Sequence, residues 1–196
     1  MVPDNFLLLG LGYLLGSIPF GVILTRLSGR GDIRSIGSGN IGATNVLRTG
    51  NKGLAAATLA LDALKGAAAV WLAVWFAGPA AAPWAAVAAV LAHCHPPWLG
   101  FRGGKGVATA LGVMLGLGWP VFLIAAVSWL AAAKLSRVSS VGALSAVAVA
   151  PLAALILLDG RAALALAVIA LYVAWRHRDN IARLRAGTDP RIGDKA

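Results

Sequence analysis

The stretch VATALGVMLGLGWPVFLIAAVSWLAAA, residues 107–133, contains no charged side chain. An apolar run longer than about 18 residues is typical of a transmembrane helix. Gly116, Gly118 and the Trp119-Pro120 pair interrupt the run near its middle, and glycine followed by proline is typical of a turn. The run therefore crosses a membrane either once, as one long helix, or twice, as two short ones. This choice sets the fold of the whole chain.

The composition of the chain indicates an all-α integral membrane protein. The chain has 196 residues, of which 59% are hydrophobic and 12% are charged, and its mean hydropathy is +0.81. Soluble domains carry about 25% charged residues. A net charge of +10 would suggest nucleic acid as a partner of a soluble protein. In a membrane protein, basic residues gather on the cytoplasmic side instead. We therefore expect residues 1–196 to form a single transmembrane helical domain, with the lipid bilayer and no nucleic acid as partner.

The distribution of basic residues decides between one and two crossings. If residues 107–133 cross once, Lys134 and Arg137 lie outside, and the arginine-rich tail after residue 175 lies outside too. Two crossings, with a turn near Gly118, place every basic cluster inside, at the expense of short spans. We therefore predict seven transmembrane helices, with the N-terminus outside and the C-terminus in the cytoplasm. The predicted spans are residues 5–25, 53–77, 80–99, two short crossings within 107–133 that turn near 118–120, then 141–158 and 162–175.

This topology brings four polar segments to the cytoplasmic face: residues 35–50, 93–109, 134–142 and 176–195. The first, SIGSGNIGATNVLRTG, carries hydrogen-bonding side chains among glycines, including Ser38, Asn40, Asn45 and Arg48. Glycine lets the backbone wrap closely, and turned amides form a concavity for an anion. We interpret this segment as one wall of a phosphate site. The alternative is a flexible loop that collects glycine and asparagine for turn chemistry alone.

Two further segments supply candidate ligands for a phosphate. In GGKG, Lys105 stands among Gly103, Gly104 and Gly106, and it can present a point charge together with backbone amides. In the tail, His177 and Asn180 are three residues apart and share a helix face. The histidine could act as a base, a phosphate ligand or an orienting group. Alternatively, it is only a juxtamembrane residue in a basic flank.

Other chemistries find little support in the sequence. Gly37-x-Gly39-x-x-Gly42 matches a dinucleotide fingerprint, but a membrane helix rather than a β-strand precedes it, and GGKG lacks the spacing of a P-loop. The chain has no Glu, its seven Asp are scattered, and its three His do not form a ligand cluster. We therefore expect no metal and no cofactor.

Asp62 and Lys65 lie one helical turn apart inside the second predicted span. An ionisable residue at membrane depth is by default a candidate for function. The pair could equally be a structural lock near a helix end, and the sequence leaves both interpretations open.

Three of these segments resemble one family, the bacterial acyl-phosphate:glycerol-3-phosphate acyltransferases (the PlsY family). The similar motifs are GSGNIGATNVLR at 37–48, GFRGGKGVAT at 100–109 and HRDNIARLRAGT at 177–188, with GSIPFG at 16–21 and LDALKG at 61–66. They occur in order over nearly the whole chain. The third motif usually ends in Gly-Thr-Glu, whereas this chain has Thr188-Asp189, so Asp189 is left out of the expected site.

The resemblance implies transfer of a fatty acyl group from acyl phosphate to the 1-hydroxyl of glycerol 3-phosphate. The products are lysophosphatidic acid and phosphate, and the place is the cytoplasmic face of the bacterial inner membrane. It implies catalytic roles for Ser38, Arg48, His177 and Asn180. It implies that the substrate phosphates are bound by a second set of residues: Asn40, Asn45, Gly103, Gly104, Lys105, Gly106 and Ser139. Either His177 or a substrate phosphate would accept the proton.

Two rival functions remain. A transporter of a phosphorylated solute would place polar residues along a path at mid-membrane, whereas here they gather at one face. A metal-dependent phosphotransferase would need paired carboxylates, which the chain lacks.

Overall fold

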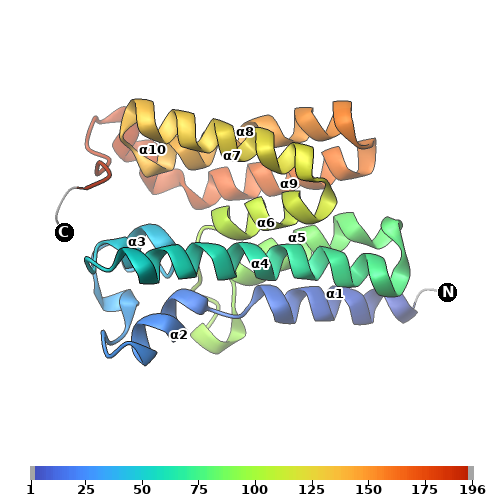
Figure 1. Cartoon of the computed structure of the whole chain (residues 1–196), viewed down its shortest axis with the longest axis horizontal. Coiled ribbons are helices and arrows are strands. Elements are labelled where there is room, and N and C mark those ends of the chain that lie inside the picture. The colour runs from blue at the N-terminus through green and yellow to red at the C-terminus, as the bar shows by residue number, and fades with distance from the viewer. Residues whose placement is uncertain (1–2, 194–196) are drawn as a thin grey trace.

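The computed structural model describes residues 3–193, with side chains from residue 9 onward, and in this range the chain is all α-helical (Figure 1). Three single-turn 3₁₀ helices, η1 to η3, lie between the α-helices at Ile33–Ser35, Pro79–Ala81 and Pro97–Leu99. The α-helices are α1 (Pro3–Gly16), α2 (Phe20–Leu27), α3 (Ala43–Leu47), α4 (Lys52–Ala77), α5 (Ala82–Cys94), α6 (Val107–Leu117), α7 (Trp119–Ser136), α8 (Ser139–Leu157), α9 (Gly160–Arg176) and α10 (Arg178–Arg185). The predicted C-terminal segment, 176–195, extends beyond the described residues.

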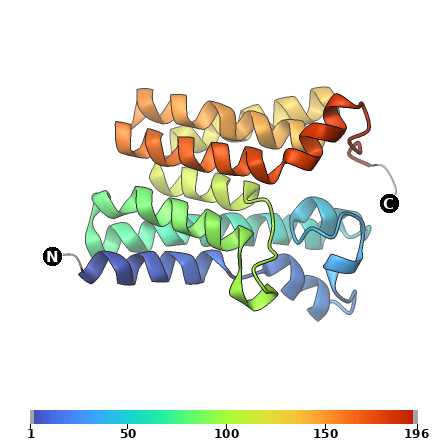
Figure 2. The ribbon, with the colours of Figure 1, turned by 180° about the vertical axis from the view of Figure 1, so that it is seen from behind.

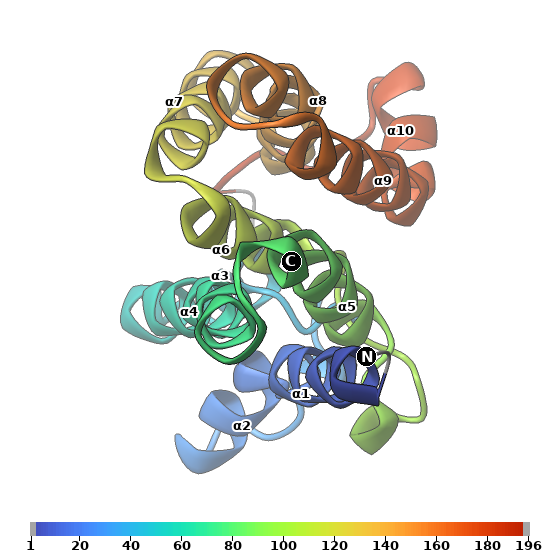
Figure 3. The same ribbon diagram turned by 90° about the vertical axis from the view of Figure 1, so that its right-hand side faces the viewer.

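The long helices run back and forth along one axis, and the polar connections gather at one end of the bundle. In Figure 1 this end is at the left, where α2, α3, α10 and the segment after α5 lie. The connections at the other end are short: the turn from α4 to α5, Gly118, and the turn from α8 to α9. Figure 3, along the bundle axis, shows α1, α4 and α5 on one side, α7, α8 and α9 on the other, and α6 between them.

Small residues let the helices approach until backbone meets backbone. A Cβ atom on Gly16 would lie 2.3 Å from the carbonyl oxygen of Ala89, and one on Gly112 would lie 1.8 Å from that of Ala63. The core between these helices is rich in alanine, with Ala86, Ala110 and Ala146 fully buried. Close approach through small residues is the usual way for helices to associate in a membrane, where lipid offers no hydrophobic drive.

The structure confirms the turn predicted at Gly118 and corrects the first predicted span. Residues 5–25 do not form one helix, because the chain breaks at Ser17–Pro19 between α1 and α2. Pro19 has no N–H to donate to a helix, and at the break the carbonyl of Ile18 accepts a bond from Lys65. Figure 2 shows the segment between α5 and α6 passing this break, where Trp98 donates to the hydroxyl of Ser17 at 2.8 Å.

Four segments of the described chain are long and apolar enough, by length and composition, to cross a membrane: Leu9–Leu27, Lys52–Ala77, Trp119–Ser136 and Ser139–Leu157. The other passes of the bundle are shorter, with 13 residues in α5, 11 in α6 and 17 in α9. The all-α, multi-span character of the chain is therefore clear, while the count of seven crossings stays a prediction.

The contact between α4 and α6 provides a test of this packing. We expect Gly112→Ala to destabilise the fold by about 2 kcal/mol, because the new methyl group would clash with backbone atoms of α4, which can move only by shifting the helix. In detergent, this lowers the melting temperature by roughly 5 °C. Gly160→Ala is the matched control, since a Cβ there meets nothing within 4 Å. Equal melting temperatures for the two variants would contradict the close contact.

Candidate active site

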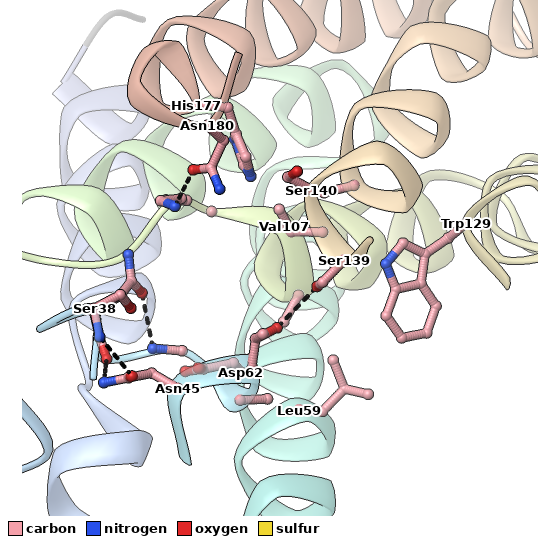
Figure 4. A pocket seen from close by; sticks show the side chains of 18 of the residues that line it. Ser38, Asn45, Leu59, Asp62, Val107, Trp129, Ser139, Ser140, His177 and Asn180 are labelled. Carbon is pink, nitrogen blue, oxygen red and sulfur yellow. Dashed lines mark hydrogen bonds between the residues drawn. The ribbon is translucent and has the colours of Figure 1, made fainter. Parts of the chain in front are cut away.

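One cavity at the polar end of the bundle is lined by residues from all four predicted polar segments (Figure 4). Its volume is about 140 Å³. Its charged and hydroxyl-bearing side chains suit a polar molecule. The polar lining comprises Ser38, Asn40, Thr44, Asn45, Arg48, Asp62, His93, Lys105, Ser139, Ser140, His177, Asn180, Arg183 and Asp189.

Asn45 holds the first segment in shape. Its amide nitrogen donates to the backbone carbonyls of Ile33, Ile36 and Asn40 at 3.1, 2.9 and 2.8 Å, and its side-chain oxygen accepts from the N–H of Ser38 at 3.1 Å. The residue is 2% exposed. Its hydrogen-bonding groups therefore serve the loop itself. We predicted from the sequence that Asn45 binds phosphate directly. In this geometry the Asn45 side chain has no free donor for a phosphate.

The loop that Asn45 folds presents Ser38 and Arg48 to the cavity. Gly37 adopts a left-handed conformation with φ of 54°, and the Arg48 side chain packs against it, so that a Cβ on Gly37 would lie 2.9 Å from Arg48 Cδ. Asn40 accepts a bond from the N–H of Gly42 at 2.9 Å, which turns the chain into α3. The glycines of this segment therefore shape the loop and make room for the guanidinium.

Lys105 belongs to a hydrogen-bonded chain that ends on Asp189. The ammonium of Lys105 donates to the amide oxygen of Asn180. The amide nitrogen of Asn180 donates to both carboxylate oxygens of Asp189, at 3.0 and 3.2 Å. Asp189 also accepts bonds from Ser140 and, at 2.8 Å, from Arg183. Burial lowers the pKa of Lys105, and the positive charge of Arg183 lowers it further. An anion entering the cavity would favour the charged ammonium.

Asp189, which sequence reasoning left out of the site, is therefore its structural centre. Its side chain is 3% exposed, although it lies in the tail beyond α10. Burial alone would raise the pKa of this carboxyl, but the hydrogen bonds from Ser140, Arg183 and Asn180 outweigh burial and lower the pKa. Asp189 stays ionised and ties the tail to the start of α8.

His177 caps α10 and faces the cavity as a neutral imidazole. Its Nδ1 lies 2.8 Å from the carbonyl oxygen of Val173. Since a carbonyl only accepts, Nδ1 carries the proton and Nε2 keeps its lone pair. Burial lowers the pKa of His177 to about 4, against a smaller raising effect of the Val173 bond. Near pH 7 the ring can accept a hydrogen bond, but it is a weak base.

The structure departs from the prediction at Gly103 and Gly104. The N–H groups of these residues donate to the carbonyls of Cys94 and His93, at 3.0 and 3.1 Å, and neither glycine lines the cavity. Arg176, which sequence reasoning did not single out, donates to the carbonyl of Gly104 at 2.9 Å and to that of Gly103 at 3.3 Å. These two glycines thus support Lys105 and offer no free amide to a phosphate.

Several helices begin at the cavity. Gly106, Val107 and Ala108 at the start of α6 line it, as do Ser139 and Ser140 at the start of α8. The Ser139 hydroxyl lies 3.1 Å from that of Thr44 and joins α8 to the first segment. The first N–H groups of a helix lack intrahelical partners, and the helix dipole makes this end positive. Within the described residues, no group of three or more His, Cys, Asp or Glu side chains could hold a metal.

We expect Asp189→Asn to lower the free energy of unfolding by about 2 kcal/mol at neutral pH, because it removes the charge that Ser140 and Arg183 stabilise. The melting temperature should fall by roughly 5 °C. Since the pKa of Asp189 is lowered in the fold, the difference from wild type should shrink as the pH falls below about 4. Asp179→Asn is the control, because its side chain is 75% exposed. A constant difference at all pH values would contradict this assignment.

Comparisons with known proteins identify relatives of this chain. A family model described as glycerol-3-phosphate acyltransferase matches residues 6–187. A glycerol-3-phosphate acyltransferase of Ruegeria pomeroyi is 60% identical over 187 residues, covering 95% of this chain and 92% of the relative. One from Mesorhizobium japonicum is 60% identical over 94% of both chains.

Two solved structures are also similar. Crystal structures of PlsY (YgiH), an integral membrane glycerol 3-phosphate acyltransferase, match in a glycerol 3-phosphate form and a lysophosphatidic acid form, with TM-scores of 0.91 and 0.90. The sequence identities are 37% and 36%, and each match covers 97% of this chain and 96% of the other. The resemblance seen in the three motifs is confirmed: the chain belongs to the glycerol-3-phosphate acyltransferase family, multi-pass integral membrane enzymes that acylate glycerol 3-phosphate to lysophosphatidic acid.

Proposed function

We propose that this enzyme takes its acyl group from acyl phosphate and that both phosphates are held at the cavity between Arg48 and Lys105. The observation that carries this proposal is the meeting of these two cations with the starts of α6 and α8 at one small polar cavity. A planar guanidinium and a compact ammonium suit two different phosphate positions. The solved relatives, in forms with glycerol 3-phosphate and lysophosphatidic acid, support a site of this kind.

Lys105 and the start of α6 receive the phosphate of glycerol 3-phosphate. Lys105 precedes the cap residue Gly106, so its charge adds to the positive end of the helix. Arg48 and Ser38, on the opposite loop, receive the phosphate of the donor and stabilise the negative charge that develops there. Asn40 and Ser139 border the same cavity and complete its polar wall.

The acyl chain enters from the bilayer. The cavity has an apolar wall made by Leu59, Leu111, Trp129 and Ala143, from α4, α6, α7 and α8. Because the rest of the lining is mostly polar, only the reacting carbonyl lies inside and the tail runs along the helices from this apolar wall. Figure 4 shows Leu59 and Trp129 on the side of the cavity opposite to His177 and Asn180.

The transfer proceeds in one step. Oxygen O1 of glycerol 3-phosphate forms a bond to the acyl carbonyl carbon, and the bond from that carbon to the phosphate oxygen breaks, so that phosphate leaves. Acyl phosphate is a mixed anhydride with a good leaving group, so a covalent enzyme intermediate is unnecessary. Holding the two reactants together can supply about 7 to 11 kcal/mol.

The proton of the attacking hydroxyl goes to the phosphate of glycerol 3-phosphate. With a pKa of about 4, His177 is a weaker base than this phosphate, whose second pKa is about 6. The acyl group withdraws electrons from the donor phosphate and makes it less basic than the acceptor phosphate. His177 Nε2 then orients the substrate by accepting a hydrogen bond from its 2-hydroxyl, while Asn180 holds Lys105 in place.

We further propose seven crossings of the bacterial inner membrane, with the cavity at the cytoplasmic face, the N-terminus outside and the C-terminus inside. Exposed aromatic side chains lie near the end opposite the cavity, on Trp75, Phe76, Trp84 and Trp119. Such aromatic belts are typical of a membrane–water interface. With 11 residues, α6 rises about 16 Å, so the bilayer would thin locally around it.

The donor and the role of Lys105 are tested together. Purified enzyme in detergent, supplied with glycerol 3-phosphate, should form lysophosphatidate with acyl phosphate and none with acyl-CoA, and a chelator should have no effect. Lys105→Ala should raise KM for glycerol 3-phosphate by roughly tenfold or more, as expected when a charge-assisted hydrogen bond is lost. The control is Lys134→Ala, an exposed lysine at the end of α7. Product formed from acyl-CoA alone, or an unchanged KM in Lys105→Ala, would overturn these assignments.

The proton acceptor is tested by the pH profile. Because the pKa of His177 is lowered to about 4, this ring stays neutral from about pH 5 to 8 and adds no inflection there. We expect kcat to fall below about pH 6, where the acceptor phosphate gains its second proton. A phosphonate analogue of glycerol 3-phosphate, with a higher second pKa, should move the inflection upward. An inflection that ignores the analogue and moves in His177→Gln would assign the proton to the histidine.

A further inference from the structure

Lys65 is a lysine buried in the bundle, and each of its three N–H donors has a partner. The ammonium donates to the carbonyl oxygen of Ile18 at 2.6 Å, to Asp62 Oδ1 at 2.7 Å and to His93 Nδ1 at 3.0 Å. The side chains of Asp62, Lys65 and His93 are 2%, 2% and 3% exposed. A lysine has three donors and no acceptor, so this arrangement uses it fully. It joins the α1–α2 break, α4 and α5 at one point.

The opposite edge of the His93 ring presses on Gly104. A Cβ built on Gly104 would lie 2.0 Å from His93 Nε2, and 2.9 and 3.0 Å from the two ring carbons beside it. These distances place the added methyl carbon in line with the Nε2 edge, in the plane of the ring. The ring therefore fills the space between Lys65 and the backbone of residue 104. Only a glycine fits there, which explains this residue without a direct contact to phosphate.

The segment that His93 supports is the one that carries Lys105. The N–H of Gly104 donates to the carbonyl of His93 at 3.1 Å, and Arg176 holds the carbonyl of Gly104 from the side of α9. Residue 105 follows directly. A shift of the ring would therefore move the backbone that aims the Lys105 ammonium at the cavity.

We propose that Asp62, Lys65 and His93 are positioning residues that set the place of Lys105 through Gly104, and so tune the affinity for the phosphate of glycerol 3-phosphate. This inference rests on the proposed role of Lys105. It differs from a structural lock, which would affect stability alone. Positioning predicts an effect on KM for glycerol 3-phosphate that persists when stability is restored.

The first experiment separates the two effects. Lys65→Met alone leaves the carboxylate of Asp62 buried without its partner and should lower the melting temperature sharply. The double variant Asp62→Asn with Lys65→Met removes both charges and should recover most of this loss. Because His93 still lacks its donor, KM for glycerol 3-phosphate should stay raised by roughly tenfold, while KM for acyl phosphate changes little. The control is Asp159→Asn, which alters a helix cap at the far end of the bundle.

The second experiment tests the contact between the ring and the glycine. Gly104→Ala should raise KM for glycerol 3-phosphate strongly, because the methyl group would occupy the place of His93 Nε2. His93→Asn keeps an amide that can accept from Lys65, but it removes the far edge of the ring. In this background, Gly104→Ala should cost much less than in wild type, because the clash is gone. Additive effects of the two substitutions would overturn the proposal.

Lys105→Ala, measured in the same assay, separates failure of this inference from failure of the proposed site. If Lys105→Ala leaves KM unchanged, the phosphate lies elsewhere and both proposals fall. If Lys105→Ala raises KM while the stable double variant has a normal KM, the proposed site stands and the positioning role of Lys65 is overturned. A raised KM in both variants supports the inference.

Discussion

The hydrogen bonds from Lys105 to Asn180, and from Asn180 to Asp189, hold the site together. They connect the start of α6 with α10 and the tail, and Ser140 extends the connection to α8. Together with the bonds from Arg176 to the carbonyls of Gly103 and Gly104, they join the two sides of the bundle shown in Figure 3 at its polar end. The bonds also hold a positive charge at the proposed place of a phosphate. Since an ammonium paired only with a neutral amide keeps its charge available, the network both positions Lys105 and leaves it able to bind an anion.

The sequence predicts the architecture well where a physical rule acts over a long range. Charge asymmetry and the glycine–proline turn led to two short helices between residues 107 and 133, and the structure has its turn at Gly118. The break at Ser17–Pro19 was missed because residues 5–25 are apolar throughout, and composition does not reveal a helix that ends inside such a run. Pro19 was the available signal.

The sequence predicts which residues line the site better than it predicts what each of them does. Lys105, His177 and Asn180 line the cavity, as predicted. Asn45, Gly103 and Gly104 instead form hydrogen bonds to backbone carbonyls. Residue type alone does not distinguish a ligand from a scaffold, because an amide binds a phosphate or a carbonyl equally well. Asp189 was left out of the predicted site because the chain departs from the motif there. An acid that follows four arginines in the tail was nevertheless a signal for a buried ion pair. The partner of Lys65 on α5, His93, lies 28 residues away, and no local spacing could have indicated it.

The two-faced lining of the cavity also bears on how the product leaves. Lysophosphatidate has one phosphate and one fatty tail, which correspond to the polar and apolar walls on which its precursors lay. The newly formed lipid is thus already oriented with its headgroup toward water and its tail among the other tails. It can diffuse sideways into the leaflet that borders the cavity without turning over, and the enzyme then delivers each molecule to the membrane in the orientation that a phospholipid has there.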